Sequence, residues 1–131
     1  MIDSADEFVR LRGSSDPRDY RRVAVDEASD QVWLEIITRY PEERVGVAKN
    51  KTVPISVLEI LISDPDARVR FMVAMKRKFS SQLLERLAQD VDESIRMKVA
   101  QHKNTSRATL ESLRFDPWQD VRAVVEGRLD N

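Results

Sequence analysis

Apolar residues recur along this chain at intervals of 24 or 26 residues, and polar residues fill the positions between them. Three columns, meaning sets of residues at the same position of successive units, show the pattern. They are Val-Ala (23–24, 47–48, 73–74, 99–100), Leu-Glu (34–35, 58–59, 84–85, 110–111) and a single Ile or Leu (37, 61, 87, 113). Because several columns stay in register over four units, the pattern predicts a repeat protein.

Each unit is predicted to form two short helices. In the third unit, Asp66 stands where an N-cap residue would accept from free amides of the first turn. Val69 and Val73 follow at helical spacing, and Lys76-Arg77-Lys78 suits the end of that helix. Ser80 or Ser81 is expected to cap a second helix, whose inward residues are Leu83, Leu84 and Leu87.

One helix pair cannot bury its own apolar stripe, so neighbouring pairs have to stack. The sequence therefore predicts an all-α fold, a solenoid of about four and a half two-helix repeats of 24–26 residues, within one domain over residues 1–131. The expected parts are an N-terminal capping segment (1–15, with a helix over 4–12), repeats at 16–41, 42–65, 66–91 and 92–117, and a half-repeat at 118–131. In the half-repeat, Glu126 replaces the repeated alanine, so that face is expected to meet water.

Composition excludes several kinds of site. Hydrophobic residues make up 41% and charged residues 34%, which is a globular composition. There is no Cys, one His and only three separated Gly, which excludes thiolate chemistry, two-histidine metal sites and glycine-rich phosphate loops. We expect no catalytic residues, no bound metal and no cofactor. Without a signal peptide or a long apolar stretch, a cytoplasmic protein without a membrane partner is expected.

One run of residues resembles a known family. Val47-Ala48-Lys49-Asn50-Lys51-Thr52-Val53-Pro54, followed by Val57-Leu58, Leu61, Asp64-Pro65-Asp66 and Val69-Arg70, is similar to the leucine-rich repeat variant, a bacterial relative of HEAT-like and armadillo-like repeats. The resemblance covers about residues 16–128 and implies a right-handed superhelix. In the founding type, one helix of each pair is a 3₁₀ helix, whereas the longer steps here favour two α-helices. The family's iron–sulfur cluster does not transfer, because the chain has no Cys.

Charge is sorted between two kinds of loop, although the formal net charge is only −1. The loops within units carry basic residues and no acid: Lys49, Lys51, Lys76, Arg77, Lys78, Lys103 and Arg107. The loops between units carry mainly acids. The arrangement has two interpretations. Charges at helix ends compensate the helix dipoles, or the basic loops form a strip that binds an anionic partner, either an acidic protein surface or nucleic acid.

Three further sets of recurring polar residues can be interpreted from the sequence: the glutamates, the aspartate pairs and the column of His102. The glutamates of the Leu-Glu column are expected to line a second-helix face, where they form ion pairs with a column of arginines or contact a partner. The members are Glu35, Glu59, Glu85 and Glu111, opposite Arg44, Arg70, Arg96 and Arg122. The recurring Asp pairs at 64/66, 90/92 and 116/120 are interpreted as helix caps. His102 aligns with Asn50 and Lys76 in a column expected to be exposed.

These observations favour a non-catalytic protein–protein interaction module, an adaptor, scaffold or inhibitor, working as a monomer or weak dimer. The expected partner is a protein with an acidic surface. Nucleic acid binding through the basic loops is the alternative, and a hydrolase is the third hypothesis. Overall acidity (pI about 5.9) and the lack of interleaved aromatic residues argue against nucleic acid.

Overall fold

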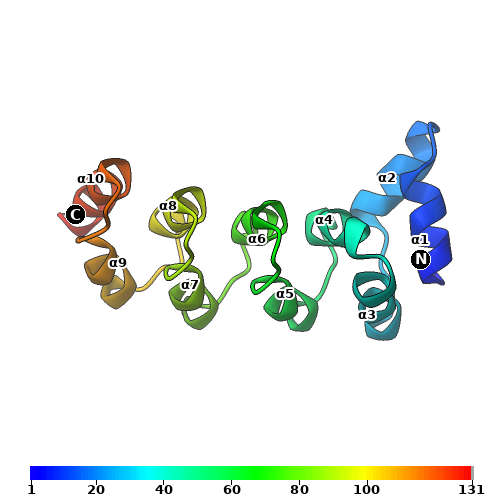
Figure 1. Ribbon diagram of the computed structural model, residues 1–131, viewed down its shortest axis with the longest axis horizontal. Coiled ribbons are helices and arrows are strands. Elements are labelled where there is room, and N and C mark those ends of the chain that lie inside the picture. Colours follow the sequence, from blue (N-terminus) through cyan, green and yellow to red (C-terminus); the bar gives the residue numbers. More distant parts are fainter. Residues whose placement is uncertain (131) are drawn as a thin grey trace. The chain divides into compact units, whose positions relative to one another are not determined.

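The computed structural model describes residues 1–130, and these form ten α-helices, one 3₁₀ helix and no β-strand (Figure 1). The predicted all-α class is thereby confirmed. Contacts divide the chain into two compact units, unit 1 (Met1–Val73) and unit 2 (Ala74–Asn131). The boundary falls inside the third predicted repeat, at the end of one helix. That the chain forms a single domain stays a prediction.

Unit 1 contains α1 (Ala5–Arg12), α2 (Pro17–Val25), α3 (Asp30–Arg39), the 3₁₀ helix η1 (Pro41–Glu43), α4 (Arg44–Lys49), α5 (Ile55–Leu61) and nearly all of α6 (Ala67–Ala74). Unit 2 contains α7 (Ser81–Leu87), α8 (Glu93–Gln101), α9 (Arg107–Leu113) and α10 (Gln119–Leu129). Each predicted full repeat thus holds two α-helices, and the predicted half-repeat holds one. A 3₁₀ member of each pair is not found among the described residues.

Side-chain caps begin most of these helices, as the sequence indicates. Ser4 Oγ accepts from the Glu7 amide at 3.0 Å, which starts α1. Asp66 Oδ1 accepts from the Arg68 amide at 2.9 Å at the start of α6, and Ser80 Oγ accepts from the Leu83 amide at 3.4 Å at the start of α7. These bonds satisfy amides that have no partner within their own helix.

In the core of unit 1, corresponding helices of successive repeats contact one another. Helix α2 contacts α4, and α3 contacts α5, while α1 covers both α2 and α3. Phe8 of α1 meets Trp33 of α3 edge-to-face, with ring centroids 5.8 Å apart, and both side chains are fully buried. The α1 helix therefore closes one end of this unit by burying aromatic rings.

The helices of unit 2 pack on their neighbours in a similar way. Helix α7 packs on α8, α9 packs on α10, and α8 contacts α10. The Val-Ala column at residues 99–100 and the leucines of α7 and α9 supply the core, with Leu84 and Val99 fully buried. Glu126 is exposed, as expected for the end of the predicted array.

The first repeat departs from the predicted pattern of buried residues. Leu34 is 41% exposed, although its column is buried at Leu58, Leu84 and Leu110. Trp33 and Ile36 are buried instead, because α1 packs against α3 and turns its apolar face toward Phe8.

Candidate functional site

The recurring aspartates at 64/66 and 90/92 are structural caps, as the sequence predicts, whereas Asp120 lies in the first turn of α10, whose N-cap is Trp118 without a side-chain cap. Asp90 Oδ1 accepts from the Asp92 amide at 2.9 Å, and Asp92 Oδ1 accepts from the Ser94 amide at 2.8 Å. Asp64 and Asp66 repeat this relay at 2.9 Å. Asp64 and Asp116 are buried, so the loops between repeats present less acidic surface than their composition suggests.

Two members of the arginine column, Arg44 and Arg96, pair with aspartates, and the predicted pairing with the glutamate column is wrong. Arg44 Nη1 lies 3.1 Å from Asp64 Oδ2, and Arg96 Nε lies 2.6 Å from Asp116 Oδ2. Each pair links the first helix of a repeat to the loop that ends the same repeat and leads to the next first helix. The arginines also donate to backbone oxygens, as Arg96 does to Asp90 at 2.9 Å and Arg122 does to Asp116 at 2.6 Å.

The column of Asn50 and His102 lies in contact with the preceding repeat, so its predicted exposure is wrong. Asn50 is fully buried, and its Nδ2 donates to the Val23 oxygen at 2.7 Å and the Asp26 oxygen at 3.0 Å. His102 Nε2 lies 2.8 Å from the Lys76 oxygen. These side chains satisfy carbonyls at or just beyond helix ends, which have no partner within the helix.

Two hydrogen bonds fix the orientation of the His102 ring. The Asn104 amide donates to His102 Nδ1 at 3.0 Å, so this nitrogen is the acceptor and Nε2 carries the proton that reaches Lys76. In the next repeat, Arg128 stands in the same column as His102. Its Nη1 donates to the Ala100 oxygen at 2.8 Å and the His102 oxygen at 2.7 Å. The ring is a structural link between repeats.

Two basic loops of unit 2 lie side by side, and we name their residues the basic edge: Lys76, Arg77, Lys78, Lys103 and Arg107. Asn104 Nδ2 ties the loops together by donating to the Phe79 oxygen at 3.0 Å. Arg77 and Lys103 line a shallow hollow of about 290 Å³ between the loops, together with Gln101 and His102. Arg77, Lys78 and Lys103 are exposed and form no ion pair among residues 1–130.

The remaining members of the predicted strip have different surroundings. Arg107 lies 3.7 Å from Glu111, a loose pair at the surface. Burial lowers the pKa of Lys76 to about 8, with a smaller effect from the charge of Lys78. Lys49 and Lys51 are exposed in unit 1. A continuous strip of all seven residues therefore stays a prediction.

The glutamate face is divided between paired and solvated members. Glu35 Oε1 accepts from Arg39 at 2.6 Å, and Glu111 Oε2 lies 3.3 Å from Arg114. Glu59 and Glu85 are exposed and form no ion pair among the described residues. The pairs lie within a helix or at its end, where exposed ion pairs contribute about 0.2–0.5 kcal/mol.

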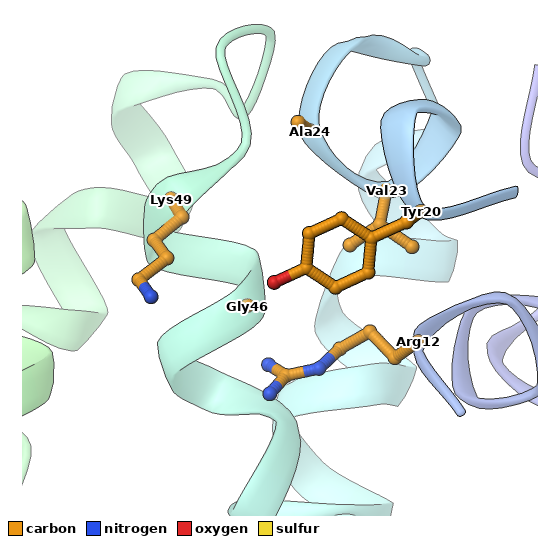
Figure 2. A pocket seen from close by; sticks show the side chains of 6 residues that line it. All are labelled: Arg12, Tyr20, Val23, Ala24, Gly46 and Lys49. Atoms are coloured by element: carbon orange, nitrogen blue, oxygen red, sulfur yellow. The ribbon is translucent and has the colours of Figure 1, made fainter. Parts of the chain in front are cut away.

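A second hollow, of about 110 Å³, lies in unit 1 and was not predicted from the sequence. Its lining is Arg12, Tyr20, Val23, Ala24, Gly46 and Lys49. Figure 2 shows the Arg12 guanidinium and the Tyr20 hydroxyl pointing toward Gly46. The one sequence signal was a glycine inside a helical pattern, which often marks a close approach of other groups to the backbone.

No group of three or more His, Asp or Glu side chains within residues 1–130 is placed to hold a metal ion. In the same part of the chain, every helix is too short or too polar to cross a membrane.

Comparison with known proteins gives no match: no protein-family profile, no curated protein and no solved structure is similar to this chain. The resemblance to the leucine-rich repeat variant therefore stays a prediction.

Proposed function

We propose that this chain is a non-catalytic protein-interaction module, and that the basic edge binds an acidic surface of a partner protein. The observation that carries the proposal is the group of Arg77, Lys78 and Lys103, three exposed cations on two adjacent loops without an ion pair among residues 1–130. Compensation of helix dipoles explains charge at helix ends, but it does not require adjacent loops to be free of acids.

We also propose that the helix pairs stack in order along the whole chain as a right-handed superhelix, as the family resemblance implies. Contacts of α2 with α4, of α3 with α5 and of α8 with α10 support this proposal within each unit. Stacking of this kind places the loops of successive repeats along one edge, so that adjacent loops act as one surface.

A protein partner fits the basic edge better than nucleic acid does. Proteins that bind single strands stack bases on exposed aromatic rings. Phe79, the aromatic residue between these loops, is buried with 1% exposure and offers no such platform. The chain as a whole carries a net charge of −1 and so lacks the basic excess that is typical of nucleic-acid-binding domains.

Fluorescence anisotropy with a labelled peptide rich in Asp and Glu tests the proposal, using a peptide with Gln at the acidic positions as reference. We expect saturable binding to the acidic peptide at about 50 mM salt. The variant Arg77→Gln/Lys78→Gln/Lys103→Gln should bind about tenfold more weakly. A labelled DNA duplex of the same length serves as the second probe.

The matched control is Arg10→Gln/Arg21→Gln/Arg86→Gln, which removes the same charge from exposed arginines on α1, α2 and α7. This control should keep most of the affinity if the position of the cations matters. Equal weakening by both variants would reduce the effect to net charge and refute the proposal. Tight binding to the duplex alone would favour the nucleic-acid alternative.

A further inference from the structure

Large apolar side chains are exposed on the loops between repeats of unit 2, and we name them the aromatic edge: Val91, Phe115, Pro117 and Trp118. Phe115 is 84% exposed and Val91 is 88% exposed. Phe115 and Pro117 line an open hollow of about 430 Å³. Apolar side chains that gather around a hollow indicate an interaction surface, whereas single exposed ones need no explanation.

Arg96 holds the two loops of the aromatic edge together. Its Nη1 donates to the Val91 oxygen at 3.1 Å, and its Nε donates to Asp116 Oδ2 at 2.6 Å. Asp116 is the neighbour of Phe115 in the sequence. One guanidinium thus binds both loops, so the exposed side chains of the two loops belong to one surface.

Carboxylates without a cationic partner border the aromatic edge. Asp92 is the N-cap of α8, Glu93 is the first residue of that helix, and Asp120 lies in the first turn of α10. None of the three forms an ion pair among residues 1–130. A cation brought by a partner would therefore gain ion pairs here without displacing one.

The basic edge lies at the other end of the same helix. Helix α8 starts at Glu93 and ends at Gln101, which lines the hollow of the basic edge with Arg77 and Lys103. A helix of 9 residues is about 13 Å long, so the cations of one copy do not reach its own aromatic edge. Met75, which is 52% exposed, directly precedes the basic edge. The two edges are thus complementary in charge, and both have exposed apolar side chains.

We propose that the aromatic edge binds the basic edge of a second copy of this chain. The cations of one copy face the three unpaired carboxylates of the other, and Met75 packs on Phe115. Both halves of this contact are present on one chain, which favours a second copy over another basic protein. The inference rests on the proposed function, because it names the acidic surface that the basic edge binds.

The contact is heterologous, because two different surfaces meet, and each copy keeps one edge open for a further copy. Two loops on each side bury little area, so we expect a weak association, with a Kd of about 0.1 mM at about 50 mM salt.

Sedimentation velocity of two variants, alone and mixed, tests this contact at about 0.1–0.5 mM protein and about 50 mM salt. The first variant, Arg77→Gln/Lys78→Gln/Lys103→Gln, lacks the basic edge. The second, Phe115→Ser/Glu93→Gln/Asp120→Asn, lacks the aromatic edge, and all three of its side chains are exposed. The natural chain should associate, and each variant alone should associate about tenfold more weakly. Their equimolar mixture should form a 1:1 dimer, because each variant supplies the edge that the other lacks.

The matched control is Arg10→Gln/Arg18→Gln/Arg21→Gln, which removes three charges from exposed arginines of α1 and α2, outside both edges. This control should associate as the natural chain does. Equal weakening in the control and in the first variant would reduce the effect to net charge and overturn the proposal. A natural chain that stays monomeric at about 0.5 mM, or a mixture that gives no dimer, would overturn it as well.

Binding of the acidic peptide distinguishes this inference from the proposed function. A chain that binds the peptide but stays monomeric refutes the second copy and leaves the proposed function standing. Loss of both peptide binding and self-association refutes both. Self-association that the acidic peptide reverses supports both, because the peptide and the second copy then compete for the basic edge.

Discussion

Asp116 illustrates how single residues hold a charge inside this fold. Its carboxylate is 2% exposed, accepts from Arg96 at 2.6 Å, and accepts from the Trp118 amide at 2.9 Å. Burial by itself would raise the pKa of Asp116, but the hydrogen bonds from Arg96 and Trp118 outweigh it and lower that pKa below its ordinary value. The ionised form is therefore the one that the folded chain stabilises.

Replacing Asp116 by Asn keeps an acceptor for the Trp118 amide and removes the charge that pairs with Arg96. We expect the free energy of unfolding, measured in urea at pH 7, to fall by about 3 kcal/mol, because Arg96 loses its buried partner. Glu111→Gln, which removes an exposed pair, should cost about 0.5 kcal/mol or less. Similar losses for the two variants would show that the buried pair contributes no more than a surface pair.

The same variant has a defined pH dependence. Because the folded pKa of Asp116 is below the unfolded one, its contribution is complete above the unfolded value of about 3.8 and disappears as pH falls through the folded pKa. The difference between Asp116→Asn and the natural chain should accordingly shrink below about pH 4.

Lys76 makes the basic edge sensitive to alkaline pH. Its pKa of about 8 means that the Lys76 side chain loses most of its charge between pH 7 and 9. Affinity for the acidic peptide should fall about two- to threefold over that interval at constant salt. In Lys76→Gln the affinity should be lower at pH 7 and nearly constant up to pH 9. An unchanged pH slope in this variant would exclude Lys76 as the titrating group.

At the scale of elements, side chains of one repeat satisfy the carbonyl oxygens at or just beyond the first-helix end of the repeat before it. Asn50 does this for α2, Arg128 does it for α8, and the backbone amide of Lys51 adds a bond of 2.8 Å to the Ala24 oxygen. At the N-terminal side, salt bridges such as Arg96–Asp116 link one first helix to the loop before the next first helix. Polar links at both helix ends therefore fix the register between repeats.

The variant Asn50→Ala tests this element-level role. It should lower the free energy of unfolding by about 2–3 kcal/mol, because the Val23 oxygen and the Thr52 amide lose the bonds that Asn50 makes to them in a buried place, and the Asp26 oxygen keeps only the bond from the Thr52 hydroxyl. Asn104→Ala is the matched control, since Asn104 is exposed and donates to the Phe79 oxygen, and it should cost about 0.5–1 kcal/mol. Urea denaturation monitored by circular dichroism measures both. Equal losses in the free energy of unfolding would mean that Asn50 stabilises the fold no more than the exposed Asn104 does.

The loop before α4 shows how one missing cap changes an element. Tyr40 and Glu42 stand where later repeats have the two capping aspartates, and here the chain forms η1. Helix α4 then starts without a side-chain cap and extends only over Arg44–Lys49. The 3₁₀ turn takes the place of a first α-helical turn, so that α4 is shorter than α6 or α8.

At the scale of the whole molecule, the sequence predicts those features that depend on neighbours along the chain. Helix positions, the caps Ser4, Asp66 and Ser80, and the exposed Glu126 all follow from local pattern. Exposure of Leu34 and burial of Asn50 were not predictable in this way, because each depends on a helix that packs from elsewhere in the sequence. The hollow beside Gly46 was missed for the same reason, since residues of three helices line it. The ordered stacking of all repeats stays a proposal.

The most direct test of the proposed function is to map the acidic peptide on the full chain by amide NMR at pH 7. We expect the largest shift changes on residues 76–79 and 102–107, and we expect them to vanish in Arg77→Gln/Lys78→Gln/Lys103→Gln. Largest changes at the helix bearing Glu85 or in the loops at Asp90 and Asp116, with residues 76–79 and 102–107 unaffected, would contradict it.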